Sequence, residues 1–441
     1  MKTLEQCKAA CESVERYGCE AIIFNPTEKK CYRKRYINLR RCSDDPVLQL
    51  HVRTDPRPAE LATPLIIDTD MSFDVDDVGA ICMAHALHDL GEARLLAVVH
   101  DSGYPRGIGA ASVLNHFYHH DNAVQLGAYK GPFGRCGADS EGAGSCFKGM
   151  PRPGNVWVTG DYVPDMVTNW QSPIKTSAQV EDAVTVYRRV LAAADDHSVV
   201  VAAIGFATNL EALLKSDSDE HSTLSGMDLV SRKVRLVVWQ GGWYPERHHQ
   251  EHPRADQEFN WGCGRHWFDP TGCEGSASYA VMNMPSNVEQ IFSETGGEFG
   301  TGGGDLLDCA DTRNPCRQAY WRTLTAWNQD PYKGRASWDP LVTLAAVRGV
   351  ENVHGRKLGA GGHNVVDPNG TNVWYDGDDA ESRQSYMALK GDIFYKDLEE
   401  RQKESQQGAR GRVPGGLPST TIDLKEEIDR LLCIPPRTAN P

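Results

Sequence analysis

Short apolar strands alternate with amphipathic helices over most of the chain, and this alternation restricts the fold more than any other feature. Four nearly continuous apolar runs predict strands: PLIID (64–68), RLLAVVH (94–100), SVVVAAIG (198–205) and VRLVVW (234–239). Helical patterns lie between and after them, at 78–90, 111–118, 180–194 and 209–214. Strands that are apolar along their whole length are buried on both faces. The sequence therefore predicts an α/β fold with a mostly parallel central sheet flanked by helices.

The length and composition allow more than one domain. With 441 residues, of which 40% are hydrophobic, the chain can bury a large core. We expect a small module at 1–53, a Pro-rich linker at 54–63, the α/β domain at 64–434 and a tail at 435–441. The RQKESQQGARGRVPGGLPS stretch (401–419) is typical of a surface loop, and it precedes a last helix at 424–432.

Charge and hydropathy exclude two classes of partner. The formal net charge is −14 and no long Lys/Arg run is present, which argues against nucleic acid or an anionic membrane as a partner. No apolar stretch reaches the roughly 18 residues of a membrane-spanning helix.

The thirteen cysteines indicate an oxidising compartment. Close pairs in polar or Gly-rich loops predict the disulfides Cys136–Cys146, Cys263–Cys273 and Cys309–Cys316. Cys82, in an apolar helix pattern, is expected to be a free buried thiol. We expect a secreted or lumenal protein, and because MKTLEQCKAAC has no apolar signal-peptide core, a mature or truncated form of it.

Five cysteines in the first 42 residues mark the small module. A helix over 3–16, with Thr3 and Gln6 as a capping box, precedes strand-like segments at 21–24 and 31–36. Fewer than 60 residues bury too little to fold securely without disulfides. The spacing resembles a PAN/apple module, a small disulfide-rich α+β fold. That resemblance implies the pairs Cys7–Cys31 and Cys11–Cys19, a partner for Cys42 upstream of Met1, and a glycan or protein ligand; a merely stabilising role is an equal alternative.

The most unusual segment is DTDMSFDVDDVGAI (68–81), which places five aspartates at the end of a predicted buried strand. In open parallel sheets, ligands bind beyond the carboxyl ends of strands. So many carboxylates in a cramped site need a compensating positive charge, and no Lys or Arg lies nearby in sequence. A hard divalent cation such as Ca²⁺ would supply it. A solvated acidic turn would account for helix-capping aspartates at 76 and 77 but not for Asp68 and Asp70.

This segment resembles the signature of the inosine–uridine-type nucleoside hydrolases, an Asp-x-Asp followed by an Asp-Asp pair that opens a helix. Three further segments resemble the family in the same order: AIGFATNLEALL (203–214), EFN (258–260) after the Gly-Gly of VVWQGGWYP (237–245), and SWDPLVTLAAV (337–347). Together they cover about residues 64–434. Members of this family hydrolyse the N-glycosidic bond of ribonucleosides and use one bound Ca²⁺.

The resemblance implies a role for each matching residue. Asp70, Asp77, Asp339 and the carbonyl of Thr208 would bind the Ca²⁺ ion. Asp70 would also act as the catalytic base. Asp76 and Asn260 would hold the ribose hydroxyls, and Glu258 the far end of the ribose.

The chain departs from the family at several positions. Five residues, rather than three, separate Asp70 from Asp76, which leaves the role of Asp74 open. Trp338 stands where many members have a histidine that protonates the leaving base. Purine-preferring members have a tryptophan there that stacks on the base, and an indole suits that task. Trp338 is therefore a second catalytic candidate, with a core aromatic as the alternative; His100 is a candidate leaving-group acid.

The sequence thus predicts a Ca²⁺-dependent ribonucleoside hydrolase, purine preference being one option. Two alternatives stay open: hydrolysis of another N-riboside, and a non-catalytic secreted binding protein. The expected partner is a small-molecule ribonucleoside, and the sequence leaves a monomer and a homo-oligomer equally open.

Overall fold

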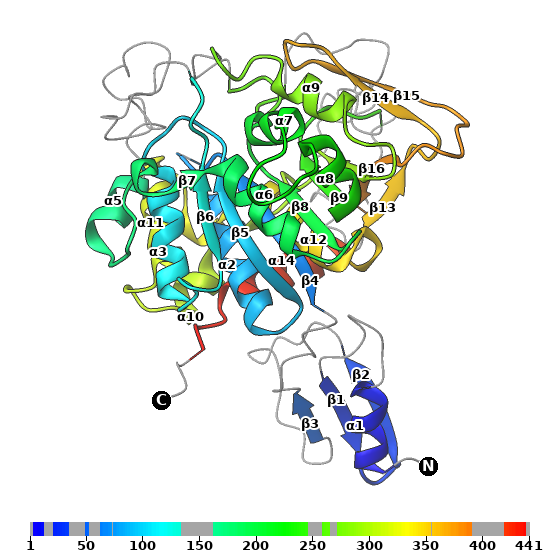
Figure 1. Ribbon diagram of the computed structural model, residues 1–441. Coiled ribbons are helices and arrows are strands. Elements are labelled where there is room, and N and C mark those ends of the chain that lie inside the picture. Colours follow the sequence, from blue (N-terminus) through cyan, green and yellow to red (C-terminus); the bar gives the residue numbers. More distant parts are fainter. Residues whose placement is uncertain are drawn as a thin grey trace, which may run out of the picture.

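The computed structural model describes residues 3–12, 21–34, 49–52, 62–72, 74–133, 162–245, 258–264, 271–353, 355–389 and 419–437. A nine-stranded sheet forms the centre of the main domain, in the order β13-β16-β10-β9-β8-β4-β5-β6-β7 (Figure 1). Neighbouring strands are parallel except β13, which is antiparallel to β16. The strands are β4 (Thr63–Thr69), β5 (Ala93–His100), β6 (Gln125–Ala128), β7 (Glu181–Asp182), β8 (Val199–Ala203), β9 (Val234–Gln240), β10 (Glu289–Ser293), β13 (Gly355–Leu358) and β16 (Gln384–Leu389).

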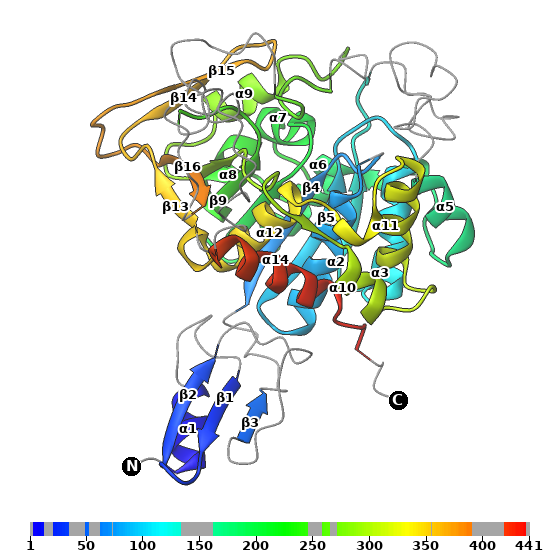
Figure 2. The same cartoon turned by 180° about the vertical axis from the view of Figure 1, so that it is seen from behind.

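Helices cover both faces of this sheet. One layer contains α2 (Asp76–Asp89), α3 (Gly107–Phe117), α5 (Tyr162–Asn169), α10 (Gly304–Cys309), α11 (Pro315–Ala326), α12 (Trp338–Arg348) and α14 (Ser419–Leu432). The other contains α6 (Ala183–Ala193), α7 (Thr208–Lys215), α8 (Gly226–Lys233) and α9 (Ser276–Met282). Figures 1 and 2 show the sheet between the two layers.

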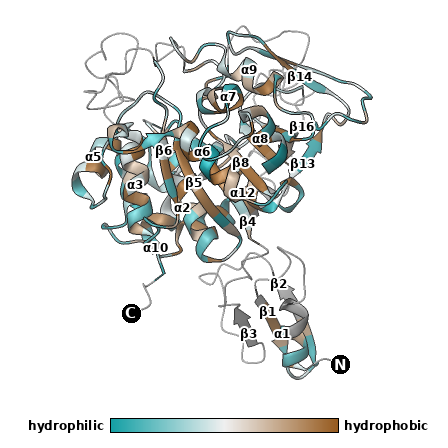
Figure 3. Ribbon diagram, viewed as in Figure 1, coloured by the Kyte–Doolittle hydropathy of each residue, from teal (hydrophilic) through white to brown (hydrophobic). Residues whose placement is uncertain are grey.

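The apolar character of the strands explains this arrangement. Leu65 and Ile67 of β4 pack into the core cluster with α2 and α12, while Ile66 packs into the cluster on the α6 side. Successive side chains of a strand point to opposite faces, so a strand buried on both faces has to be apolar throughout. Figure 3 shows the strands as mostly hydrophobic and the outer helix surfaces as more hydrophilic. The predicted fold class is confirmed.

Two small antiparallel ribbons complete the main domain. β11 (Gly300–Thr301) pairs with β12 (Arg335–Ala336), and β14 (His363–Val366) pairs with β15 (Asn372–Tyr375). The first ribbon leads directly into α12, and it therefore helps to position the start of that helix. Among the described residues, no helix is both long enough and apolar enough to cross a membrane.

The N-terminal part forms a separate small sheet with one helix. α1 (Leu4–Glu12) precedes β1 (Ala21–Asn25), β2 (Lys30–Lys34) and β3 (Gln49–Val52), which pair in the order β2-β1-β3. The predicted capping box is present, since Thr3 N donates to Gln6 Oε1 (2.9 Å) and Gln6 N to Thr3 Oγ1 (3.2 Å). The resemblance to PAN/apple modules remains a prediction, as do the domain boundaries.

Four disulfides lie within the described residues, and two of them differ from the predicted pairing. Cys7–Cys31 and Cys263–Cys273 form as expected. Cys309 bonds to Cys433 rather than to Cys316, and Cys316 bonds to Cys82, which is therefore not a free thiol. These bonds tie α10 to the end of α14 and α2 to α11. The expected pairs Cys136–Cys146 and Cys11–Cys19, and Cys42, include residues outside the described ranges.

Candidate active site

Aspartates from two distant segments converge at the carboxyl ends of the central strands. Asp70 directly follows β4, and Asp76 and Asp77 are the first residues of α2. Asp339 lies in the first turn of α12, which packs against α2. Carboxylate oxygens of Asp76, Asp77 and Asp339 lie within 4.8 Å of one another. The N-termini of both helices favour this negative charge through their dipoles.

A cavity of about 650 Å³ opens over these carboxylates. Its acidic lining consists of Asp70, Asp74, Asp76, Asp77, Glu258, Glu294 and Asp339. Its other polar and aromatic lining includes Ser72, Gln240, Trp243, Asn260, Arg335 and Trp338. The volume is in the ordinary range for a small-molecule site. All of the ligand, base and substrate-binding residues proposed from the sequence except Thr208 therefore line one cavity, and the candidate acid His100 does not.

The electrostatics of the cavity favour a bound cation. Burial, together with the neighbouring carboxylates, raises the pKa of Asp70, Asp76, Asp77 and Asp339 well above the usual range. Four buried carboxylates are costly to ionise side by side unless a positive charge lies between them. Their oxygens are hard ligands of the kind that Ca²⁺ and Mg²⁺ prefer. The donor set thus fits one hard divalent cation.

Glycine at position 205 allows two strand ends to meet behind the aspartates. A Cβ atom there would lie 2.4 Å from the backbone N of Asp70 and 2.3 Å from Asp101 Oδ2. Asp101 follows β5 and is completely buried beside this turn. Asp101 was not predicted from the sequence, although its place directly after a predicted strand was a usable signal.

Glu258 and Asn260 are held on the opposite wall by the backbone. Glu258 accepts hydrogen bonds from the N–H groups of Asn260 (3.1 Å) and Trp261 (3.0 Å). Burial raises the pKa of Glu258 to about 7, although these N–H groups oppose the shift. Asn260 Nδ2 donates to the carbonyls of Ile204 (3.2 Å) and Gln240 (3.0 Å). With Nδ2 committed to the ends of β8 and β9, Asn260 Oδ1 is the group that remains for a ligand hydroxyl.

Thr208, Asp68 and His100 are not among the residues that line the cavity. Thr208 begins α7, and its hydroxyl donates to the Asp101 carbonyl. Asp68 accepts from Tyr187 Oη (2.9 Å) and Asn209 Nδ2 (2.8 Å), and burial raises its pKa to about 7. The His100 nitrogens lie 3.1 Å from the Ser102 carbonyl and 3.0 Å from the Met71 carbonyl. His100 therefore braces the turn after β4 and is poorly placed to act as the leaving-group acid.

Asp74 forms an ion pair that sequence spacing could not reveal. Arg335 Nε donates to Asp74 Oδ1 (2.8 Å) and Arg335 Nη2 to Oδ2 (2.5 Å). Burial alone would raise the pKa of Asp74, but Arg335 lowers it below the usual range. The Arg335 guanidinium carbon lies 4.9 Å from the centre of the Trp338 ring.

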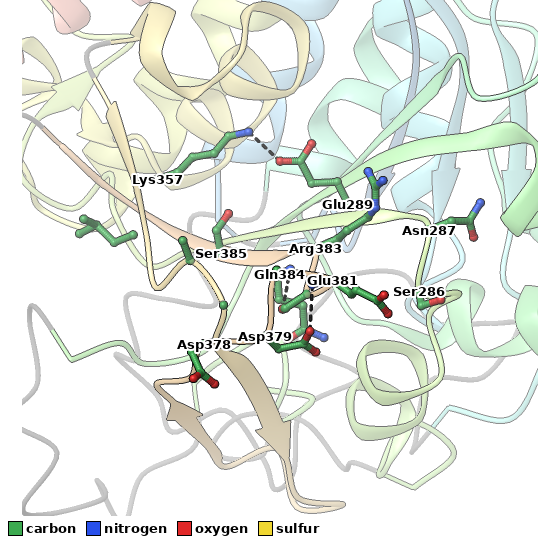
Figure 4. Close-up of a pocket in the computed structure, with 15 residues that line it drawn as sticks. Ser286, Asn287, Glu289, Lys357, Asp378, Asp379, Glu381, Arg383, Gln384 and Ser385 are labelled. Carbon is green, nitrogen blue, oxygen red and sulfur yellow. Dashed lines mark hydrogen bonds and ion pairs between the residues drawn. The ribbon is translucent and has the colours of Figure 1, made fainter.

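A second hollow, of about 960 Å³, lies away from the aspartates (Figure 4). It is bordered by Ser286–Glu289, the end of β13 and residues 378–385. Lys357 and Glu289 form an ion pair there (2.6 Å). Its lining has no group of convergent buried carboxylates among the described residues, and we do not regard it as the reaction site.

The fold is that of the nucleoside hydrolases. A purine-preferring ribonucleoside hydrolase from Gardnerella vaginalis matches with a TM-score of 0.50 and 16% identity, over 84% of this chain and 99% of that one. An inosine-guanosine nucleoside hydrolase matches with a TM-score of 0.50 and 15% identity, over 83% and 98%. The type III effector protein XopQ, solved with adenosine diphosphate ribose, matches with a TM-score of 0.51 and 15% identity, over 85% and 95%.

These likenesses extend to the fold alone, because the sequence identities are low. No family profile matches the sequence, and no curated protein matches it. A shared fold does not by itself define function, which depends on the residues of the site.

Proposed function

We propose that the protein hydrolyses the N-glycosidic bond of ribonucleosides with the help of one Ca²⁺ ion. One observation carries the proposal. Asp70, Asp76 and Asp77 on one segment and Asp339 on another form the acidic floor of a single cavity, within a nucleoside hydrolase fold.

Asp70, Asp77, Asp339 and the carbonyl of Thr208 would hold the ion. Oxygen ligands of this type and number suit Ca²⁺. Asp76 also offers an oxygen within 4.8 Å of those of Asp77 and Asp339, so it lies close to the same point. Ca²⁺, when bound, lowers the pKa of a coordinated water and neutralises part of the carboxylate charge.

The remaining steps belong to side chains of this chain. Asp76 and Oδ1 of Asn260 accept hydrogen bonds from the ribose hydroxyls, and Glu258 binds the far end of the sugar. This fixes C1′ close to Asp70, which accepts a proton from the attacking water. The water oxygen bonds to C1′ as the C1′–N bond breaks. The bonding pair leaves with the base, which takes up a proton to give free base and ribose.

The charge of the cavity suits this reaction. As the C1′–N bond lengthens, positive charge develops on the ribose ring, and the buried carboxylates of the lining favour it. Trp338, on the wall above Asp339, supplies an aromatic surface for the leaving base. A purine offers more area for this contact than a pyrimidine does, so we propose a preference for purine nucleosides.

A second candidate is a ligand that contains a ribose but is not a simple nucleoside. The neighbour XopQ was solved with adenosine diphosphate ribose, and the cavity of about 650 Å³ leaves room beyond one nucleoside. We also propose that the small module binds a glycan or a protein outside the cell. The disulfides are compatible with an extracellular or lumenal location.

A substrate panel tests the function. Inosine, guanosine, adenosine, uridine, nicotinamide riboside and adenosine diphosphate ribose are incubated with the protein, with Ca²⁺ or with a chelator, and free ribose and base are measured. We expect Ca²⁺-dependent release from nucleosides. Asp70→Asn should abolish release while the fold persists, whereas Asp311→Asn, at an exposed aspartate outside the cavity, should retain it. Activity in Asp70→Asn equal to that of the original chain would refute the assignment of the base.

A further inference from the structure

Arg335 is the only basic side chain among the described residues that line the cavity. It lies in β12, where it pairs with Thr301 of β11, four residues before Asp339. A basic residue is unexpected where a cation would bind, since it would compete with the ion for the carboxylates. A role other than metal binding is therefore expected for Arg335, which lies beside seven acidic side chains.

Asp74 explains part of this, because it forms the ion pair that holds Arg335 in place. The two Arg335–Asp74 hydrogen bonds, of 2.8 and 2.5 Å, form a bidentate pair that fixes the guanidinium plane. Asp74 itself is anchored, since its Oδ1 accepts from the backbone N–H of Val75 (2.8 Å). Both side chains are mostly buried, at 16% and 25% exposure. The guanidinium is thus a fixed element of the cavity wall.

The pairing leaves part of the guanidinium available. A guanidinium has five N–H donors, and Asp74 takes one from Nε and one from Nη2. In the described part of the chain, no protein acceptor binds the two Nη1 donors. The free Nη1 and Nη2 donors form a second parallel pair, directed away from Asp74.

The neighbouring indole indicates which ligand group would meet these donors. The guanidinium carbon lies 4.9 Å from the Trp338 ring centre, within cation–π distance, so the guanidinium borders the indole. A flat ring that lies on the rest of the indole, in the same layer, would meet the guanidinium edge to edge. The ligand group is therefore the base rather than the ribose.

The charge of the surroundings favours a neutral acceptor pair over a phosphate. Asp74 already neutralises Arg335, and Asp70, Asp76 and Glu258 line the same cavity. A phosphate at this point would be repelled by these carboxylates, whereas a carbonyl oxygen and a ring nitrogen would not. O6 and N7 of a 6-oxopurine are such a pair, and arginine binds them with two parallel hydrogen bonds in nucleic-acid recognition.

We propose that Arg335, oriented by Asp74, binds O6 and N7 of the base and makes 6-oxopurine nucleosides the preferred substrates, an inference that rests on the proposed hydrolase function. Adenine presents an N6 amino donor beside N7, so the donors of Arg335 would face a donor. As the C1′–N9 bond breaks, its electron pair passes into the purine, and the added charge at O6 and N7 strengthens both hydrogen bonds. Arg335 is then a catalytic residue and Asp74 a positioning residue.

The test compares kcat/KM for inosine and adenosine in four variants. Arg335→Gln should lower kcat/KM for inosine by about 5- to 150-fold, the range that a bidentate arginine contact supplies, with a much smaller change for adenosine. Arg335→Lys, which keeps the charge but loses the fork, should recover only part of the preference. Asp74→Asn should also reduce the inosine-to-adenosine ratio. Lys357→Gln, at a basic residue of the second hollow, is the matched control and should leave the ratio unchanged.

Equal losses for both substrates in Arg335→Gln would overturn the proposal, because a purely structural role lowers both alike. A binding measurement separates this failure from failure of the hydrolase function. Hypoxanthine and adenine are titrated calorimetrically into the original chain and into Arg335→Gln. We expect hypoxanthine to bind more tightly, and the difference to vanish in the variant. If no nucleoside is hydrolysed but this difference is found, the hydrolase function fails and base recognition by Arg335 stands; equal binding of both bases overturns the recognition.

Discussion

The backbone N–H of Asp339 points at Asp76 Oδ2 across 3.4 Å, although 263 residues separate the two in sequence. This contact joins the first turns of α12 and α2, which pack side by side. Both helices begin at the same edge of the sheet, so their first-turn carboxylates face a common point. The positions of these carboxylates are therefore set by the packing of α2 against α12, which places the first turns of the two helices side by side.

A bound cation should stabilise the whole domain because it removes the repulsion at this point. An ion that binds only the folded state at 100 times its Kd adds about 2.7 kcal/mol to the free energy of unfolding. We expect Ca²⁺ to raise Tm and a chelator to lower it, measured by differential scanning calorimetry. Asp339→Asn should abolish the response, and Asp311→Asn should retain it. An identical Tm with ion and with chelator would contradict a built metal site.

The metal-free protein should become less stable as pH rises from 5.5 to 8. Burial raises the folded-state pKa of Asp68 and of Glu258 to about 7, above the unfolded values near 4. Over this range the folded state binds more protons than the unfolded state, so the free energy of unfolding falls with rising pH. Urea unfolding of the chelated protein at several pH values measures this. A free energy of unfolding that increases toward pH 8 would contradict the assigned shifts.

The fold could be predicted from sequence because its signal is local. β8 is apolar at every position and β4 from Pro64 to Ile67, so each was recognisable without knowledge of its neighbours. Asp70, Asp76 and Asp77 were recognisable for the same reason, since they follow a strand and open a helix. The start of α2 at Asp76 rather than at residue 78 shows that these aspartates belong to the helix itself.

Features that depend on distant partners could not be predicted. Arg335 and Asp74 are 261 residues apart, and neither segment contains a motif that indicates the other. Cys82 was expected to be free because a buried disulfide and a buried thiol occur in the same apolar surroundings. Cys309 and Cys316 were predicted to bond to each other because they are close in sequence. In the structure α2 packs against α11, and Cys316 bonds to Cys82 of α2 instead.

Peptide mapping under non-reducing conditions tests the cysteine assignment. We expect linked peptides that contain Cys82 with Cys316, Cys263 with Cys273 and Cys309 with Cys433. Removal of the Cys309–Cys433 bond by paired serine substitutions should lower the free energy of unfolding by about 2–4 kcal/mol, because the unfolded chain loses a long cross-link. A peptide pair that joins Cys309 to Cys316 would show that α14 is not anchored as described.

The docking of α14 depends on a buried arginine at the end of α12. Arg348 donates through Nε (2.8 Å) and Nη2 (3.0 Å) to Glu92, and through Nη1 (2.7 Å) to Glu427 of α14. Burial would raise the pKa of Glu427, but Arg348 and Arg430 lower it below the usual range. Glu427 is therefore ionised at neutral pH, and it depends on the guanidinium.

Arg348→Ala should consequently leave buried negative charge without its main partner and cost about 3–5 kcal/mol of the free energy of unfolding. Lys357→Ala breaks a more exposed ion pair, with Glu289 at 2.6 Å, and should cost only about 0–1 kcal/mol. Urea unfolding of both variants, followed by circular dichroism, provides the comparison. Equal and small losses in the two variants would mean that the apolar contacts of α14, rather than Arg348, hold it on α2.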